Sequence, residues 1–84
     1  RRAIGERVQL MSDYNQALPV AEALRRVEAL GDEGLAWIEE PTLAEDDAAH
    51  AQICRKSRVP IQIGENWWGP AQMARSLAAG ACEV

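Results

Sequence analysis

The sequence predicts an α/β fold with parallel strands, a (βα)3 segment of a (β/α)8 TIM-like barrel that is truncated at both ends. Three apolar runs of strand length alternate with three helical patterns, and each run ends in acidic or amide residues. Strands that alternate with helices favour a parallel sheet with right-handed crossovers. The acids at the strand ends recur every 26 residues, a constant step that favours a barrel over an open sheet.

The predicted strands are short apolar runs bounded by turn residues or acids, as buried strands are. They lie within residues 7–15, 35–41 and 59–66, which read RVQLMSDYN, LAWIEEP and VPIQIGEN. A fourth strand is expected to begin at the closing residues ACEV.

The first two predicted helices follow the first two strands. Val20, Leu24 and Val27 have helical spacing, and Gly31 supplies a left-handed stop. The second helix is expected to begin near the acids 45–47, because negative side chains suit the positive end of a helix dipole.

The third predicted helix begins at Pro70, a residue that suits the first helical position. Met73 and Leu77 form its apolar stripe, and Gly80 ends it.

Composition excludes several classes of function. The 84 residues are 48% apolar and 26% charged, with a net charge of −4, which argues against nucleic acid or an anionic membrane as partner. No run of 18 apolar residues is present, so no membrane span is expected. Cys54 and Cys82 are too few for a disulfide framework, so we interpret them as small buried apolar residues in a reducing, cytoplasmic compartment.

Both ends of the chain are unusual for a natural domain. The sequence starts with Arg-Arg-Ala and closes on the apolar stretch AGACEV. We therefore expect residues 1–84 to form part of a barrel domain within a longer protein.

Asp13, Glu39 and Glu65 each follow an apolar run, with 26 residues from one acid to the next. Ligands of parallel α/β folds bind at the carboxyl ends of strands, and neighbouring strands lie about 4.8 Å apart. Three carboxylates at that spacing repel one another unless a cation compensates them. Hard oxygen ligands of this kind favour Mg²⁺. The alternative is that these acids are solvated loop residues or helix caps.

Glu40 competes with Glu39 for the inward-facing position, since successive side chains of a strand point to opposite faces. The constant step favours Glu39. Glu40 is then expected to lie behind the metal ligands and to bond a neighbouring lysine or asparagine. Trp37 shares the parity of Glu39 and either fills a core layer or faces the same side as the acid.

Three motifs resemble the enolase superfamily, in particular its mandelate racemase subgroup: DYNQ at 13–16, WIEEPT at 37–42 and GENWWGP at 64–70. The resemblance runs through nearly the whole chain. It implies that Asp13, Glu39 and Glu65 are the three Mg²⁺ ligands, at the ends of the third, fourth and fifth barrel strands. It also implies that Asn15 contacts the substrate.

The resemblance further implies an isomerase that removes the proton next to a substrate carboxylate through a Mg²⁺-stabilised enediolate, racemizing a 2-hydroxy acid. A dehydratase of acid sugars, with the same ligands, is the alternative. The family's lysine pair and histidine–aspartate base fall outside this chain, so no catalytic acid or base is expected within it. The isolated chain is then a non-catalytic segment, and the whole protein is expected to bind a small carboxylate and to form homo-oligomers.

The remaining conspicuous side chains have simpler interpretations. His50 and Lys56, the only histidine and lysine, fall in the second predicted helix and are expected to be ordinary packing or surface residues. Trp67 and Trp68 follow the third acid and either pack the helix onto the strand ends or line a substrate cavity.

Overall fold

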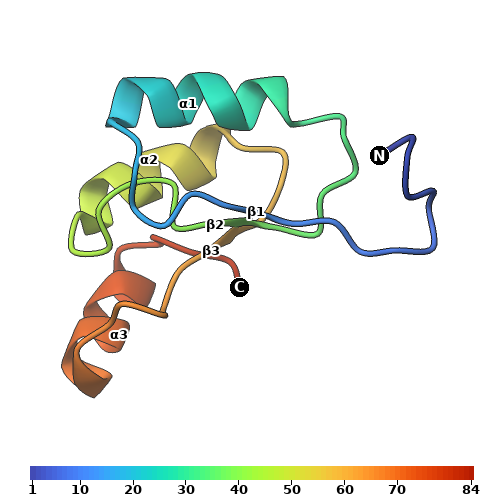
Figure 1. Ribbon diagram of the computed structural model, residues 1–84. Coiled ribbons are helices and arrows are strands. Elements are labelled where there is room, and N and C mark those ends of the chain that lie inside the picture. Colours follow the sequence, from blue (N-terminus) through green and yellow to red (C-terminus); the bar gives the residue numbers. More distant parts are fainter.

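The computed structural model describes residues 1–84, which form three strands and three helices in alternation (Figure 1). The elements are β1 (Ser12–Asp13), α1 (Val20–Ala29), β2 (Ile38–Glu39), α2 (Asp47–Lys56), β3 (Ile61–Gln62) and α3 (Gly69–Ala78). Figure 1 shows α1 and α2 side by side along the strands, with α3 beyond β3.

The three strands form one parallel sheet in the order β1-β2-β3. Asp13 lies opposite Glu39, and Glu39 lies opposite Gln62. The predicted α/β fold with parallel strands is therefore confirmed for this chain, and its arrangement agrees with a fragment of a larger barrel.

The strands are much shorter than predicted, with two residues each. Backbone bonds continue past them, from Gln16 N to Glu40 O (2.8 Å) and from Leu18 N to Pro41 O (3.1 Å). However, the φ angles of Asn15 (48°), Gln16 (65°) and Glu40 (36°) are positive. Because such angles are incompatible with a β-strand, the neighbouring chains stay bonded while the regular ladder ends.

The fourth strand predicted at ACEV is absent, so that prediction is wrong. Glu83 N does donate to Ile61 O (2.9 Å), so the chain runs beside β3. The N–H of Ile61, however, donates to the Glu83 side chain, at 3.1 Å from Oε2. A carboxylate thus takes the position of the backbone acceptor that a further ladder would need.

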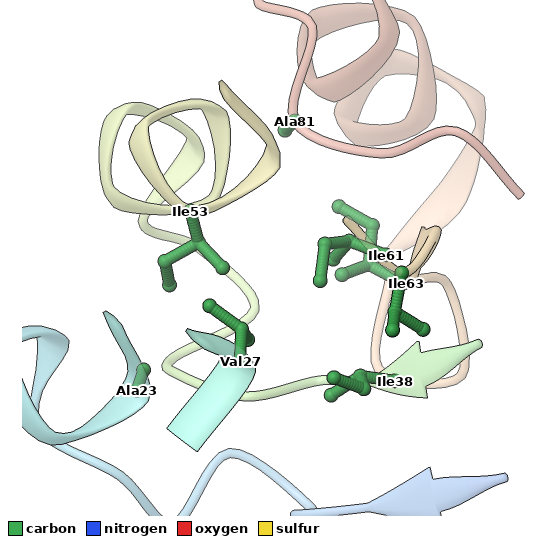
Figure 2. Packing of buried hydrophobic residues seen from close by; sticks show 8 residues of the cluster. Ala23, Val27, Ile38, Ile53, Ile61, Ile63 and Ala81 are labelled. Atoms are coloured by element: carbon green, nitrogen blue, oxygen red, sulfur yellow. The ribbon is translucent and has the colours of Figure 1, made fainter. Parts of the chain in front are cut away.

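The hydrophobic core lies between the sheet and the first two helices (Figure 2). Its eight buried members are Ala23, Val27, Ile38, Ile53, Val59, Ile61, Ile63 and Ala81. Because side chains alternate along a strand, Ile38 and Ile61 face the helices while Glu39 and Gln62 face the opposite side. Ser12 pairs with Ile38 and gives β1 no apolar side chain at that position.

Helices α1 and α2 lie where the sequence predicted them, but Gly31 lacks the positive φ of the left-handed stop predicted for α1, so that part of the prediction is wrong. Ala23 and Val27 are the buried residues of α1. Helix α2 begins after Asp46, whose carboxylate accepts a hydrogen bond from Ala49 N (2.9 Å), so the acids predicted at this start do cap it.

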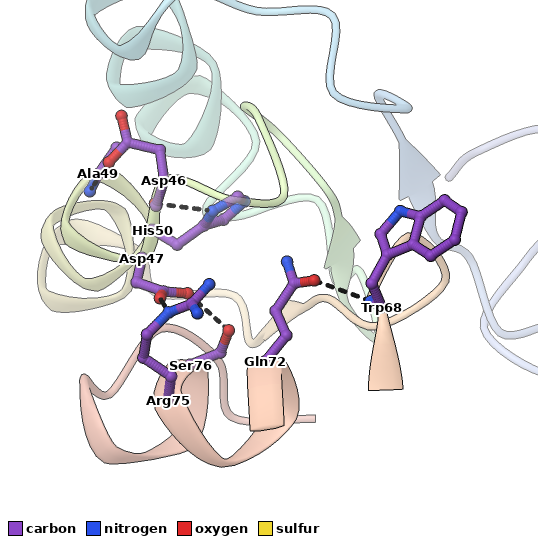
Figure 3. Close-up of polar contacts among 8 residues, drawn as sticks. All are labelled: Asp46, Asp47, Ala49, His50, Trp68, Gln72, Arg75 and Ser76. Carbon is purple, nitrogen blue, oxygen red and sulfur yellow. Dashed lines mark hydrogen bonds and ion pairs between the residues drawn. The ribbon is translucent and has the colours of Figure 1, made fainter. Parts of the chain in front are cut away.

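The apolar stripe of helix α3 is exposed on the surface of this chain. Met73 is 42% exposed and Leu77 is 54% exposed, whereas Ser76 is fully buried. Ser76 Oγ donates to Asp47 Oδ1 (2.5 Å) and Arg75 Nε donates to Asp47 Oδ2 (2.9 Å), as Figure 3 shows. These bonds turn the polar face of α3 toward α2, and the apolar stripe therefore faces away.

The two cysteines are free and half-buried, packed against the core. Burial raises the pKa of the Cys54 thiol to about 12 and also raises the pKa of Cys82. Both thiols therefore stay protonated near neutral pH and act as small apolar residues. None of the helices has the length and apolar character needed to cross a lipid bilayer.

Candidate metal centre

Asp13, Glu39 and Glu65 converge at the carboxyl ends of the strands. One carboxylate oxygen from each lies within 4.8 Å of the others, with Glu39 half-buried and the other two exposed. Mg²⁺ holds its oxygen ligands at 2.0–2.1 Å in octahedral geometry, so two ligand oxygens are about 2.9 Å apart when adjacent and about 4.2 Å apart when opposite. The three carboxylate oxygens, which all lie within 4.8 Å of one another, would therefore draw closer together on binding such an ion, and the exposed side chains of Asp13 and Glu65 have room to rotate. The three residues therefore fit a small divalent cation.

Asp13 is positioned by β1 and by the turn that follows. Its Oδ1 accepts a hydrogen bond from the backbone N–H of Asn15 (2.8 Å), and the positive φ of Asn15 forms this turn. Asn15 itself is exposed, two residues beyond the first acid. Its backbone therefore orients Asp13.

Glu39 is positioned by the central strand and by one tryptophan. Trp37 Nε1 donates to Glu39 Oε2 (3.2 Å), which places both side chains on the face predicted from their shared parity. This bond occupies one oxygen and leaves the other available to a cation.

Glu65 reaches the same point by another route. The residue opposite Glu39 on β3 is Gln62, so the third acid is not in register with the first two, contrary to the constant step in the sequence. Glu65 stands in the turn after β3, where Gly64 has a φ of 145°. A Cβ at Gly64 would lie 3.3 Å from the Trp67 ring, so glycine allows the close packing that bends the chain.

Glu40 is fully buried and accepts two hydrogen bonds from one residue. The Asn66 backbone N–H bonds Oε1 (3.2 Å) and the Asn66 side-chain amide bonds Oε2 (2.6 Å). An asparagine partner was among those expected, but the sequence did not single out Asn66. A signal was present: a buried carboxylate needs a donor, and Asn66 directly follows the third acid.

His50 and Lys56 take the ordinary roles expected of them. His50 is fully buried in α2, with Nδ1 3.2 Å from Asp46 O, and burial lowers its pKa (Figure 3). Lys56 is exposed at the end of the same helix.

The two tryptophans after Glu65 behave differently. Trp67 is half-buried and packs against the core and Gly64. Trp68 is 91% exposed, and its backbone N–H donates to Gln72 Oε1 (2.8 Å) at the start of α3 (Figure 3). Packing therefore explains Trp67, while the Trp68 ring stands free at this edge of the molecule.

Comparison with known proteins gives a match over the whole chain. Residues 1–84 match the family model described as enolase C-terminal domain-like. A D-galactarolactone cycloisomerase from Agrobacterium fabrum is 34% identical over 84 residues, which are all of this chain and 22% of that protein. The chain thus spans about a fifth of the length of this curated relative.

Solved structures of similar proteins contain magnesium. An enolase from Bradyrhizobium, complexed with magnesium and mandelic acid, is 48% identical with a TM-score of 0.93, over 98% of this chain and 23% of that one. An L-talarate dehydratase from Polaromonas sp. JS666, complexed with Mg and L-glucarate, is 32% identical with a TM-score of 0.94 over the same shares. The expected cofactor is therefore confirmed for the proteins that this chain resembles.

Proposed function

Because the chain belongs to the enolase C-terminal domain-like family, which it matches over residues 1–84, we propose that Asp13, Glu39 and Glu65 bind one Mg²⁺. The convergence of the three carboxylates within 4.8 Å carries this proposal. In this view residues 1–84 contain the third to fifth βα units of a (β/α)8 barrel. Glu40 lies behind the ligands and supports them.

The parent activity that we propose is that of a mandelate-racemase-like enzyme, which racemizes a 2-hydroxy acid by removing the proton next to its carboxylate. The 48% identity to a protein complexed with magnesium and mandelic acid supports this choice. Bound magnesium supplies positive charge where negative charge develops on the substrate carboxylate. Asp13, Glu39 and Glu65 place that charge, and Asn15, exposed beside Asp13, contacts the substrate.

Removal of the substrate proton requires a catalytic base, and the histidine and lysine of this chain do not lie at the site. The only histidine is fully buried in α2, and the only lysine ends the same helix. We therefore propose that the 84-residue chain alone binds metal without catalysing turnover. Racemization of mandelate by the purified chain, followed by circular dichroism of the substrate, would overturn this part of the proposal.

An acid-sugar dehydratase is the second candidate function. The similarity to the L-talarate dehydratase complexed with Mg and L-glucarate supports it. Racemization and dehydration use the same three ligands and differ in what the bases do after proton removal. Product analysis with the whole protein separates them: exchange of the α-proton without water loss favours the racemase, and formation of a keto acid favours the dehydratase.

The metal site is tested by Glu65→Gln, which keeps the shape of the side chain and removes its charge. Because a direct ligand is lost, Mg²⁺ binding measured by calorimetry should weaken by more than the roughly 10- to 100-fold that follows loss of an outer partner. Glu45→Gln, at an exposed acid outside the site, is the matched control and should leave binding unchanged. Equal Mg²⁺ affinity in wild type and Glu65→Gln would remove Glu65 from the ligand set.

A further inference from the structure

Glu40 connects all three strand ends. Its backbone N–H donates to Gln62 O (2.9 Å) and its backbone carbonyl accepts from Gln16 N (2.8 Å). Its carboxylate accepts both donors of Asn66, at 3.2 and 2.6 Å. One residue therefore bonds the chain after β1, the chain within β3 and the turn after β3.

This arrangement costs free energy that other interactions must offset. Glu40 is fully buried, and a buried carboxylate is unfavourable unless hydrogen bonds replace its hydration. Its φ of 36° is also unusual for a residue other than glycine. Backbone strain of this kind persists where the surrounding structure enforces it, commonly at functional sites.

The bonds around the three acids show what Glu40 contributes. Asp13 accepts a bond from Asn15, and Glu39 accepts one from Trp37. No side-chain bond orients Glu65, and the strand ladder ends before it. The connection of its turn to the central strand is the pair of bonds between Asn66 and Glu40.

We propose that Glu40 and Asn66 form a positioning pair for the third metal ligand. Glu40 follows the ligand Glu39, and Asn66 follows the ligand Glu65, so the two bonds between them set the distance between the two ligands. The proposal rests on the metal site proposed above. It assigns Asn66 a role in metal binding without direct contact to the ion.

The test uses Tb³⁺, a hard oxygen-seeking ion, in place of Mg²⁺. Trp37 bonds Glu39 and can sensitise Tb³⁺ luminescence, so the titration reports binding at this site. Luminescence lifetimes in H₂O and D₂O give the number of waters on the ion. Asn66→Ala should weaken binding by about 10- to 100-fold. It should also raise the number of bound waters by about one, because Glu65 leaves the ion and water replaces it.

Two reference variants serve as controls for the number of bound waters. Glu65→Ala gives the number of bound waters when the third carboxylate is missing. Ser76→Ala removes a bond between α3 and α2 that involves none of the three acids, and it serves as the destabilised control. It should lower stability while the number of bound waters stays at the wild-type value.

An exchange of the two side chains provides the rescue. Glu40→Gln and Asn66→Asp each disrupt the pair, whereas the double variant E40Q/N66D keeps the total charge. In the double variant the new amide at position 40 donates to the new carboxylate at position 66. The new amide oxygen still accepts the backbone N–H. The affinity of the double variant should return to within about threefold of wild type, a smaller loss than the roughly 10-fold or more expected of each single change. Its number of bound waters should return to the wild-type value.

The outcomes separate the two proposals. Absence of sensitised emission in wild type would overturn the proposed metal site, and the proposal of a positioning pair, which rests on that site, would be overturned too. Wild-type binding together with an unchanged water number in Asn66→Ala overturns the positioning pair alone. A double variant no better than its single changes overturns it as well.

Discussion

The first two βα units and the third are held together by different means. β1, α1, β2 and α2 are joined by a register that aligns Asp13 with Glu39 and by a core that includes Val27, Ile38 and Ile53. The chain after β3 also places Ile63 and Ala81 in that core, but its turn and helix α3 are bonded to the other units through polar side chains: Asn66 to Glu40, and Ser76 and Arg75 to Asp47. Only the first kind of attachment follows from hydrophobic pattern and strand alternation.

The difference matters for the candidate site because the three proposed ligands come from both regions. Asp13 and Glu39 lie opposite one another in the sheet, so any sequence that forms this register brings them together. Glu65 comes from a turn, and its position depends on a glycine and a buried carboxylate–amide pair. Substitutions in the two regions should therefore affect stability and metal binding in different proportions.

Among substitutions at the candidate site, the largest expected effect on stability comes from comparing Glu40→Gln with Asp13→Asn in the absence of divalent cations. Glu40→Gln should lower the free energy of unfolding by about 2 kcal/mol, because bonds to a buried charge are weakened. Asp13→Asn should leave it unchanged or raise it, because one of three repelling charges is removed. Urea denaturation at pH 7 measures both. A loss in Asp13→Asn as large as that in Glu40→Gln would contradict the division between ligand and support.

A smaller effect is expected where α3 meets α2. Ser76→Ala should cost about 1 kcal/mol, the usual value for one hydrogen bond, because Ser76 is fully buried against Asp47. The Ser76 hydroxyl, followed by Arg75, lowers the pKa of Asp47. A lowered folded-state pKa adds stability that is complete above the unfolded value of about 3.9 and is lost as the pH falls through the folded value.

Measurement at two pH values checks this dependence. Denaturation of wild type and Ser76→Ala should differ by the full amount at pH 7, and the difference should shrink below about pH 4 as Asp47 is protonated. A difference that stays constant down to pH 2.5 would show that the charge of Asp47 does not contribute.

Much of the fold could be predicted from the sequence. Apolar runs that alternate with helical spacing indicate parallel strands and their helices, and Asp46 caps α2 as acids at a helix start do. Strand length could not be predicted, because the ladder ends where Gln16 and Glu40 adopt positive φ angles, and neither residue type demands them. The missing fourth strand has a different cause, since the Glu83 side chain takes the place of a backbone acceptor for the Ile61 N–H.

The candidate site shows the same limit. The constant 26-residue spacing correctly identified three acids that converge. The two spacings, from Asp13 to Glu39 and from Glu39 to Glu65, nevertheless arise from different structures. The first spacing matches the register between β1 and β2, whereas the second includes the turn at Gly64. A long-range side-chain pair such as Glu40 with Asn66 produces no periodic pattern in the sequence. The hydrogen bonds that support the site could therefore be identified only from the structure.

The smallest expected effect concerns the exposed stripe of α3. Leu77→Lys should change the free energy of unfolding of this chain by less than about 0.5 kcal/mol, because Leu77 is 54% exposed and is not one of the buried core residues. The matched change on α1, Val27→Lys, buries an unpaired charge and should prevent stable folding. Thermal melts followed by circular dichroism compare the two. A large loss in Leu77→Lys would show that the stripe is covered in solution, for instance by a second copy of the chain, and sedimentation at two concentrations would then detect that association.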